Sequence, residues 1–448
     1  MDEDTDHGGA TTDALAGALG RTWTEDRPWS FLTRLTAIGD RMGGGPGERE
    51  AADLVETTLA EAGVRNLTQQ SFPMERWERG EASLALLEPH ARTFETIALP
   101  YSPAGEVEGE LVDVGYGMPE EVDEADVDGK IAVASTSTPP GTRFVHRMEK
   151  FGHAVEAGAS AFVFVNHVEG QLPPTGALKF GSEASAPAVG VSKETGAWLT
   201  EYAEQGGTVR LSVDASTTPG ESQNVLGDLG PDTDEHLLLL AHYDAHDIAE
   251  GALDNGCGIA VVTAAARVLA EADLPIRVRV GAVGCEEIGL LGSEHLASVT
   301  DLDSVRGVVN VDGAGRFRDL VAMTHHSEAT RAAVESVASE TRQPIHVEHE
   351  PHPFSDQWPF VRAGVPAVQL HSDSGERGRG WGHTHADTRD KVDDRDVREH
   401  AMLTALVVRE VAGRDLGRLD RESLAEAFRD AEFERGMQAA DLWPDSWD

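Results

Sequence analysis

The sequence predicts an α/β protein with a mixed, largely parallel sheet sandwiched by helices and a mostly-β module inserted into it. Three observations lead to this prediction. Apolar strand-like runs alternate with helical patterns from residue 222 onward. A separate series of short strand-like runs with turn residues precedes them. The chain also has 448 residues, more than one compact core usually holds.

Residues 1–95 are predicted to form the N-terminal part of the main domain. Residues 1–20 are small and polar, and we expect them to be loosely ordered. Residues 29–63 place apolar side chains at helical spacing on both sides of the stretch GGGPG, which predicts two helices. The stretch SLALLEP, near 83–89, predicts a strand.

The predicted insert covers residues 96–217. Its strand-like runs are GELVDVGYG, GKIAVAS, AFVFVNH, APAVGVS and TVRLSVDAS. Helical pieces are expected near 145–158 and 193–205.

The predicted main domain covers residues 218–412. The runs NVLGDLG, HLLLLAHYD, IRVRVGAVG, GVVNVDGAG and VPAVQLHS predict strands, and GIAVVTAAARVLAEA predicts a helix. Strands that alternate with helices of this length favour a largely parallel sheet covered on both faces. Residues 413–448 form an acidic extension with helical patches, for which only packing or solvation is expected.

The charge balance restricts the partners. The net charge is -42, from 79 acids against 37 bases, and only five of the bases are lysines. Nucleic acid and anionic membranes repel such a surface. Adaptation to molar salt, which screens the self-repulsion, is the favoured explanation, and an acidic binding protein is the alternative.

The compartment is predicted from cysteine content and from the first residues. The chain has two cysteines, Cys257 and Cys285, and therefore no disulfide framework, which suits a reducing interior. The start MDEDTDHGG lacks the features of a signal peptide, and no apolar run approaches the ~18 residues of a membrane span. We therefore expect a cytoplasmic protein with no membrane partner.

Acids and histidines follow the predicted strands of the main domain directly. The motifs are LLLLAHYDAHD, GALDNGCG, VGCEEIGLLGS, VVNVDGAG and WGHTHADTRDKVD. Taken singly, each has an ordinary explanation, such as a helix N-cap for Asp254 or a strand-end position for His242. Taken together, they gather at the carboxyl edge of a sheet, where carboxylates without a cation would repel one another. Imidazole and carboxylate without thiolate suit Zn²⁺, and also Co²⁺ or Mn²⁺.

The order of these motifs resembles a known family. H-x-D, D-N-G-x-G, E-E-x-G-L-x-G-S, N-x-D and H-T-x-x-D-T resemble the motifs of the M28 family of dinuclear zinc aminopeptidases and carboxypeptidases, over residues 30–95 and 218–412. The insert resembles a protease-associated (PA) domain in VDGKIAVAS, GHAVEAGASAFVFVN and SAPAVGVS. The resemblance implies the zinc exopeptidase fold, two Zn²⁺ ions and a peptide substrate; it does not predict the oligomeric state.

The resemblance also implies a role for each matching residue. One metal is expected on His242 and Asp312, and the other on Glu287 and His383, with Asp254 bridging the two. This assignment uses one side chain from each motif.

The neighbours of these ligands receive supporting roles from the same resemblance. Glu286 is the expected general base, and Asp244 the acid that orients a ligand histidine. Asp387 either orients His383 or only holds its loop.

Several residues near the motifs leave the assignment open. His246 and His385 are further histidines, each an alternative ligand. Gly382 stands where many relatives have a tyrosine that helps to stabilise the oxyanion, so that group is undetermined. Asp356 and Gln357, in FSDQWPF, are candidates for the substrate pocket.

The favoured activity is removal of N-terminal amino acids, because the free α-amine of a substrate would meet many acids near the metals. A metallocarboxypeptidase of the same family is the nearest alternative, and it would need arginines such as Arg362 or Arg377 for the terminal carboxylate. A glutaminyl cyclase of similar fold and a non-catalytic, receptor-like relative are the remaining alternatives.

Overall fold

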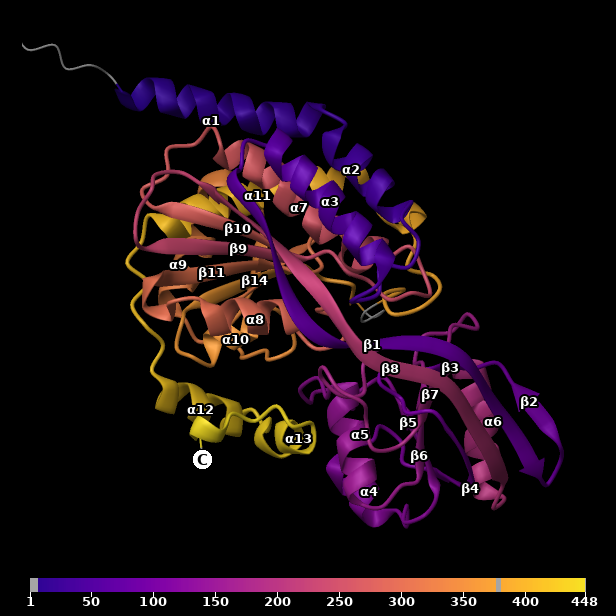
Figure 1. Cartoon of the computed structure of the whole chain (residues 1–448). Coiled ribbons are helices and arrows are strands. Elements are labelled where there is room, and N and C mark those ends of the chain that lie inside the picture. The colour runs from indigo at the N-terminus through magenta and orange to yellow at the C-terminus, as the bar shows by residue number, and fades with distance from the viewer. Residues whose placement is uncertain (1–6, 376–379, 448) are drawn as a thin grey trace, which may run out of the picture.

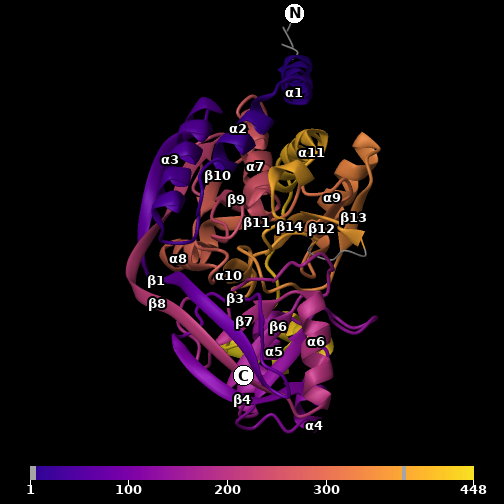
Figure 2. The ribbon, with the colours of Figure 1, turned by 90° about the vertical axis from the view of Figure 1, so that its right-hand side faces the viewer.

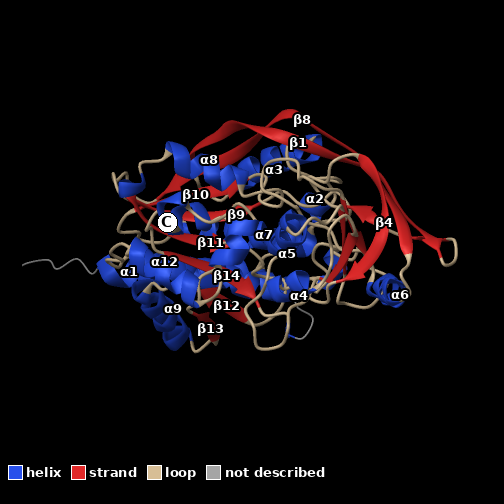
Figure 3. Ribbon diagram, turned by 90° about the horizontal axis from the view of Figure 1, so that it is seen from below, coloured by secondary structure: helices blue, strands red, loops and turns tan. Residues whose placement is uncertain are grey.

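A ribbon of two long strands joins the two lobes of the molecule (Figure 1). The computed structural model describes residues 7–375 and 380–447. Strands β1 (Arg65–Glu88) and β8 (Thr208–Leu229) pair antiparallel along most of their length. They run from the larger lobe into the smaller one, and Figure 3 shows them as a curved band along one side of the molecule.

The larger lobe is built on a mixed, largely parallel sheet, as the sequence predicts. Its strands lie in the order β13-β12-β14-β11-β9-β10-β8. The neighbours β14, β11, β9 and β10 are parallel, whereas β12 pairs antiparallel with β14 and β8 pairs antiparallel with β10. The strands are β9 (His236–His242), β10 (Arg277–Val283), β11 (Val305–Val311), β12 (Leu320–Met323), β13 (Ile345–Glu348) and β14 (Ala367–Ser372).

Helices cover both faces of this sheet. One face packs against α2 (Arg27–Thr36), α3 (Pro46–Glu61), α7 (Cys257–Leu269), α9 (Glu328–Thr341) and α11 (Asp394–Ala412). The other face packs against α8 (Leu291–Val299) and α10 (Trp358–Val361). Short helical turns complete the lobe: η1 (Ala252–Gly256), η2 (Leu302–Ser304) and η4 (Arg389–Lys391).

The interior position of β9 in the sheet explains why the sequence of this strand is almost entirely apolar. All seven residues of HLLLLAH are buried. Leu237 and Leu239 pack into the core on one face, and Leu238 and Leu240 into the core on the other. A strand covered on both faces needs apolar side chains at every position. The same burial accounts for Ala252–Leu269, a stretch apolar enough to cross a membrane by composition but 94% buried inside this lobe.

The smaller lobe contains the inserted module (Figure 2). Strands β4, β5, β6 and β7 are parallel in that order, and β3 joins antiparallel at the edge. Helices α5 and α6 pack on separate apolar clusters, and they match the two helical pieces that the sequence predicts. The elements are β2 (Arg92–Phe94), β3 (Ile97–Ala98), β4 (Gly105–Asp113), α4 (Pro119–Glu124), β5 (Ile131–Ser135), α5 (Arg147–Glu156), β6 (Ala161–Val165), β7 (Ala188–Val191) and α6 (Lys193–Glu204).

The boundaries of the insert stay a prediction. The limits 96–217 fall beside or inside strands that continue through both lobes, since β1 ends at Glu88 and β8 begins at Thr208. The ribbon therefore belongs to both lobes.

The two ends of the chain are more ordered than expected. The expectation of a loose segment at 1–20 is wrong from residue 7 onward, because α1 (His7–Thr24) is a helix that packs Leu15, Ala18 and Leu19 on the core. The acidic extension forms α12 (Arg421–Asp430), α13 (Glu434–Ala439) and η5 (Asp445–Trp447). Helix α12 packs on the larger lobe, and α13 lies against α5 of the smaller one (Figure 1).

Candidate metal centre

The predicted site residues meet at the carboxyl ends of the parallel strands. His242 is the last residue of β9, while Glu286 and Glu287 follow β10 and Asp312 follows β11. Asp254 lies in the turn η1 between β9 and α7. His383 comes from the loop after β14. This edge of an α/β sheet is where ligands collect, because the loops from several strands converge there.

The first group of potential ligands consists of His242, Asp254 and Asp312. Nε2 of His242 lies 3.5 Å from Oδ1 of Asp254 and 3.8 Å from Oδ1 of Asp312. His242 is fully buried, and the side chain of Asp312 is 14% exposed. One imidazole and two carboxylates are thus close enough to share one cation.

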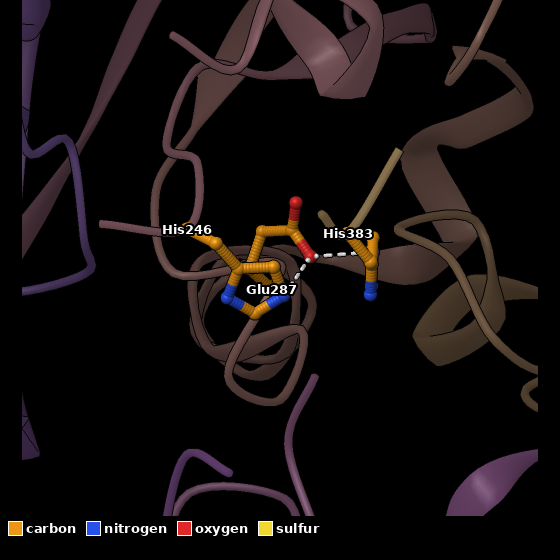
Figure 4. Close-up of side chains that lie close together, drawn as sticks. All are labelled: His246, Glu287 and His383. Atoms are coloured by element: carbon orange, nitrogen blue, oxygen red, sulfur yellow. Dashed lines mark ion pairs between the residues drawn. The ribbon is translucent and has the colours of Figure 1, made fainter. Parts of the chain in front are cut away.

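The second group consists of His246, Glu287 and His383. Oε2 of Glu287 lies 3.0 Å from Nε2 of His246 and 3.1 Å from Nε2 of His383, as the dashed lines in Figure 4 show. All three residues are buried. Two of them, Glu287 and His383, were expected on one metal; His246 was only an alternative.

Asp254 connects the two groups. Its Oδ1 lies 3.5 Å from Nε2 of His242, and its Oδ2 lies 3.3 Å from Nε2 of His383. A carboxylate whose two oxygens face two different imidazoles is suited to bridge two cations. The five expected ligands therefore come together in the expected grouping, and their binding of metal stays a prediction.

The buried donor atoms of the two groups fit divalent cations. Among the described residues, none makes a hydrogen bond of good geometry to either ring nitrogen of His242 or His246, or to Oε1 of Glu287. Buried polar atoms normally have such partners. Two ligands on one tetrahedral Zn²⁺ with bonds of about 2.0–2.1 Å lie about 3.3 Å apart, close to the spacings within the second group.

Asp244 fixes the pair of adjacent glutamates. Its Oδ1 accepts a hydrogen bond from the main-chain amide of Glu286 (3.1 Å), and its Oδ2 accepts one from the amide of Glu287 (3.2 Å). Oδ1 also lies 3.3 Å from Nδ1 of His242. The predicted orienting acid thus contacts a potential ligand and also holds the turn that carries both glutamates.

The two glutamates have opposite electrostatic environments. Burial and the neighbouring Asp312 and Glu287 raise the pKa of Glu286 well above its usual value, although His242 opposes them. Burial also opposes ionisation of Glu287, but His246 and His383 outweigh it and hold the pKa of that carboxyl well below its usual range. Environments that separate two carboxyl pKa values in this way are typical of an acid–base group beside a ligand.

Arg316 is a functional candidate that the sequence did not indicate. Its Nη2 donates to Oδ1 of Asp254 (2.6 Å) and to Oδ1 of Asp312 (3.1 Å). Burial opposes ionisation of Asp254, but Arg316 and the imidazoles of His242 and His383 hold its pKa well below the usual value. Because an arginine side chain stays charged, Arg316 keeps these carboxylates ionised.

Asp387 holds the bridging residue rather than the histidine beside it. Its carboxylate accepts hydrogen bonds from the main-chain amides of Leu253 (2.6 Å) and Asp254 (3.0 Å). Burial raises the pKa of Asp387 to about 7. Asp387 was expected either to orient His383 or to hold the loop of His383. The contacts show that it does hold a loop, but this loop is the one that carries Asp254.

Two residues from the N-terminal part support the site from behind, and sequence reasoning missed both. The buried Arg41 donates to the main-chain carbonyls of Tyr243 (3.1 Å), Glu250 (2.6 Å) and Gly251 (2.9 Å), which spans the loop after β9.

The second of these residues is Glu48, at the start of α3. It accepts a hydrogen bond from the amide of Cys285 (3.1 Å), just before the paired glutamates. Burial, and then Asp244, raises the pKa of Glu48 to about 8. A charged residue in a helical segment far away in the sequence carries no signal of such contacts.

A cavity of about 240 Å³ opens onto the metal centre between the two lobes. The insert contributes Phe144, His146 and Arg147 to its wall. The larger lobe contributes Glu286, four of the potential ligands (Asp254, Glu287, Asp312 and His383), Arg316, His352 and His371. Among the described residues that line it there is no tyrosine.

The remaining sequence candidates that the structure describes do not line this cavity. Asp356 and Gln357 are buried and do not line it. His385 belongs to neither ligand group; its Nδ1 contacts the carbonyl of Ile248 at 2.8 Å. Arg362 pairs with Glu294 at 2.5 Å outside the cavity lining, and Arg377 lies outside the described residues.

The two cysteines are packed interior residues. Burial raises the pKa of Cys257 to about 12 and that of Cys285 well above its usual value, so both thiols stay protonated. Neither lines the cavity.

The fold and the site define a metallohydrolase. A parallel α/β sheet carries two linked groups of imidazole and carboxylate ligands, with a carboxyl group of raised pKa at the edge of a cavity. Carboxylate-bridged metal pairs of this kind serve hydrolytic reactions.

Comparisons with known proteins give the family. The sequence model of Peptidase family M28 matches residues 224–408, and that of the PA domain matches residues 107–199. The chain is similar to Aminopeptidase YwaD of Bacillus subtilis (28% identity, 86% of this chain and 85% of the relative). It is also similar to Carboxypeptidase Q of Mus musculus (24% identity, 87% of each). The solved structure of BSAP, a zinc aminopeptidase from Bacillus subtilis, superposes with a TM-score of 0.68 (25% identity, 88% of this chain and 98% of that one).

Residues 224–408 therefore form a peptidase domain of family M28, and residues 107–199 form a PA domain that precedes it in the chain. The chain is a metallopeptidase, which confirms the predicted class of enzyme, and the solved zinc aminopeptidase indicates zinc as its metal.

Proposed function

We propose that the protein is an aminopeptidase that uses two Zn²⁺ ions, with Asp254 as the bridging ligand. The observation that carries this proposal is the position of the two Asp254 oxygens, which face the imidazoles of His242 and His383 separately. Co²⁺ or Mn²⁺ would suit the same donors. The aminopeptidases among the relatives support cleavage at the N-terminal end of the substrate and not at its C-terminal end.

The bound ions, Glu286 and Asp244 would have different roles in hydrolysis. When bound, the ions would lower the pKa of water and polarise the scissile carbonyl. Glu286 would accept a proton from the attacking water and return it to the leaving amine. Its side chain is 11% exposed and lines the cavity, so it has access to a substrate. Asp244 keeps Glu286 in place through the main-chain amide.

A carboxypeptidase is the second candidate, and one observation favours it. Arg147 of the insert and Arg316 of the larger lobe both line the cavity. Paired guanidinium groups bind carboxylates well. Arg316, however, is already paired with the carboxylates of Asp254 and Asp312. We therefore place the aminopeptidase first.

Substrate hydrolysis separates the two candidates. Aminoacyl p-nitroanilides should be cleaved, and N-blocked dipeptides should not be; the reverse result would establish the carboxypeptidase. Dialysis against a chelator should abolish cleavage, and added Zn²⁺ should restore it. A purified chain that holds less than about one zinc and cleaves neither substrate would contradict both candidates and favour a non-catalytic relative.

We also propose that the protein works in the cytoplasm of an organism that accumulates salt, without a nucleic-acid or membrane partner. The net charge of -42 supports this proposal, because concentrated salt screens such self-repulsion most strongly. The two free, buried cysteines suit a reducing compartment. Thermal unfolding measured from 0.1 to 3 M KCl tests the proposal: a melting temperature that does not rise with salt would contradict it.

A further inference from the structure

His246 lies inside the metal centre although none of the matched family motifs requires it. It follows β9 by four residues, and its Nε2 lies 3.0 Å from Oε2 of Glu287. Its ring stands edge-on to that of His383, with centroids 4.6 Å apart. Figure 4 shows the two imidazoles on either side of the Glu287 carboxylate.

The loop that carries His246 is fixed on both sides. Before it, the amide of Ala245 donates to the carbonyl of Arg41 (3.1 Å). After it, the carboxylate of Asp247 accepts hydrogen bonds from Nε and Nη2 of Arg79 in strand β1, the shortest at 2.8 Å and 2.7 Å respectively. A ligand held by its neighbours in this way is preorganised to bind an ion.

A simpler role for His246 would be to donate a hydrogen bond that orients Glu287. The contact at 3.0 Å lacks hydrogen-bond geometry, and no described residue bonds to either ring nitrogen. Leaving a buried imidazole without any partner is costly. A cation between His246 and Glu287 would provide the missing partner for both.

We propose that His246 is a sixth protein ligand of the metal centre, on the same ion as Glu287 and His383. This inference rests on the proposed two-metal function and extends it. The second position then has two imidazoles with Glu287 and the shared Asp254, whereas the first has one imidazole, that of His242.

The two positions should consequently differ in affinity. Imidazole nitrogen favours Zn²⁺ over Mn²⁺, whereas oxygen-rich sites suit Mn²⁺ better. The second position should therefore fill first with Zn²⁺ and retain it more strongly during dialysis. The first position, with Asp254 and Asp312, should exchange more easily.

Zinc X-ray absorption on the fully loaded wild-type enzyme tests the ligand directly. The expected result is three imidazoles for every two ions, from His242, His246 and His383. Two imidazoles for every two ions would overturn the proposal. This measurement does not depend on a variant that must fold.

Calorimetric titration of the metal-free chain with Zn²⁺ gives a second test. His246→Ala should weaken the tighter of two binding steps by tenfold or more and leave the other within about twofold; loss of even an outer partner costs about 10–100-fold. His385→Ala, which changes a histidine outside both groups, should leave both steps unchanged.

The outcomes separate this inference from the proposed function. Two steps that are unaltered in His246→Ala would overturn the role of His246 and leave the two-metal enzyme intact. A wild-type chain that binds only one ion would overturn both. Equal thermal unfolding of the metal-free wild type and variant should show that the change in affinity does not reflect misfolding.

Discussion

The main-chain carbonyl of Thr175 accepts a hydrogen bond from Nδ1 of His383, at 3.2 Å. The amide of Thr175 also donates to the carbonyl of His383, at 2.8 Å. A carbonyl can only accept, so Nδ1 of His383 carries the proton and Nε2 is left to face Asp254 and Glu287. Thr175 lies within the matched PA domain, and the insert thus sets the tautomer of a potential metal ligand.

Thr175→Pro should weaken metal binding. Proline lacks the amide hydrogen that holds His383, while Thr175→Ala keeps both main-chain contacts and serves as the control. We expect a tenfold to hundredfold loss of Zn²⁺ affinity for the proline variant, in the range found when outer partners of ligands are removed. Equilibrium dialysis measures this loss. Equal affinities for the two variants would show that the insert does not support the ligand.

Glu286→Gln should bind metal normally and lose turnover. The amide has nearly the same shape but cannot accept a proton, so kcat should fall by about 10²–10⁴-fold. Metal analysis and aminoacyl nitroanilide kinetics on the same sample check both halves of this prediction. Glu294→Gln, an equivalent change at a residue that pairs with Arg362, should leave kcat unchanged. A fully active Glu286→Gln enzyme would require another general base.

Lys150 should make the stability of the insert depend on pH. It is fully buried, and burial lowers its pKa to about 7. Between this value and the unfolded pKa of about 10.4 the unfolded chain binds more protons, so the free energy of unfolding should rise with pH; below pH 7 the cost of burying the charge is fully present. Lys150→Met should remove up to about 1.4 kcal/mol per pH unit of this slope.

Denaturant unfolding from pH 6 to 10 measures that slope. Lys150 donates to the carbonyls of Ser135 (2.8 Å) and Ser137 (2.6 Å), and the methionine variant loses both bonds. The slope, rather than the absolute stability, is therefore the informative quantity. The exposed Lys193 provides the control, since Lys193→Met should leave the slope unchanged. Parallel curves for wild type and Lys150→Met would rule out the lowered pKa.

Trp447→Ala should destabilise the larger lobe by about 3–5 kcal/mol, the usual cost of truncating a buried tryptophan. Trp447 is 6% exposed and packs on Trp358 and Phe428, at ring distances of 5.6 and 5.1 Å. Trp23 is 42% exposed, and its replacement by alanine should cost much less. Thermal unfolding compares the two; equal losses would mean that the C-terminal extension adds no core.

The potential ligands could be predicted because each lies directly after an apolar strand or in a glycine-rich turn. His242 and Asp312 illustrate this, since the strand pattern alone places both at one edge of the sheet. Their division between two ions came from the family resemblance. The role proposed for His246 needed distances, because a second histidine four residues along the same loop can point in any direction.

The supporting residues could not be predicted from the sequence. Thr175, Arg147 and Arg41 belong to segments without any catalytic pattern, and only the packing of distant segments brings them to the site. Helix α1 was missed for a different reason: its many small residues resemble a loose terminus, although Leu15, Ala18, Leu19 and Thr22 recur at helical spacing. That periodicity is the signal from which the helix can be predicted.

The ribbon of β1 and β8 limits how the molecule can move. The chain enters the smaller lobe through β1 and leaves it through β8, and these two strands are hydrogen-bonded to each other. The connection between the lobes is therefore a paired ribbon and not two flexible linkers. Pairing along its middle is irregular between Arg79 and Ala82, and Arg79 is itself fastened to Asp247. We therefore expect little movement of one lobe relative to the other, so that the cavity at the metal centre should keep a similar width.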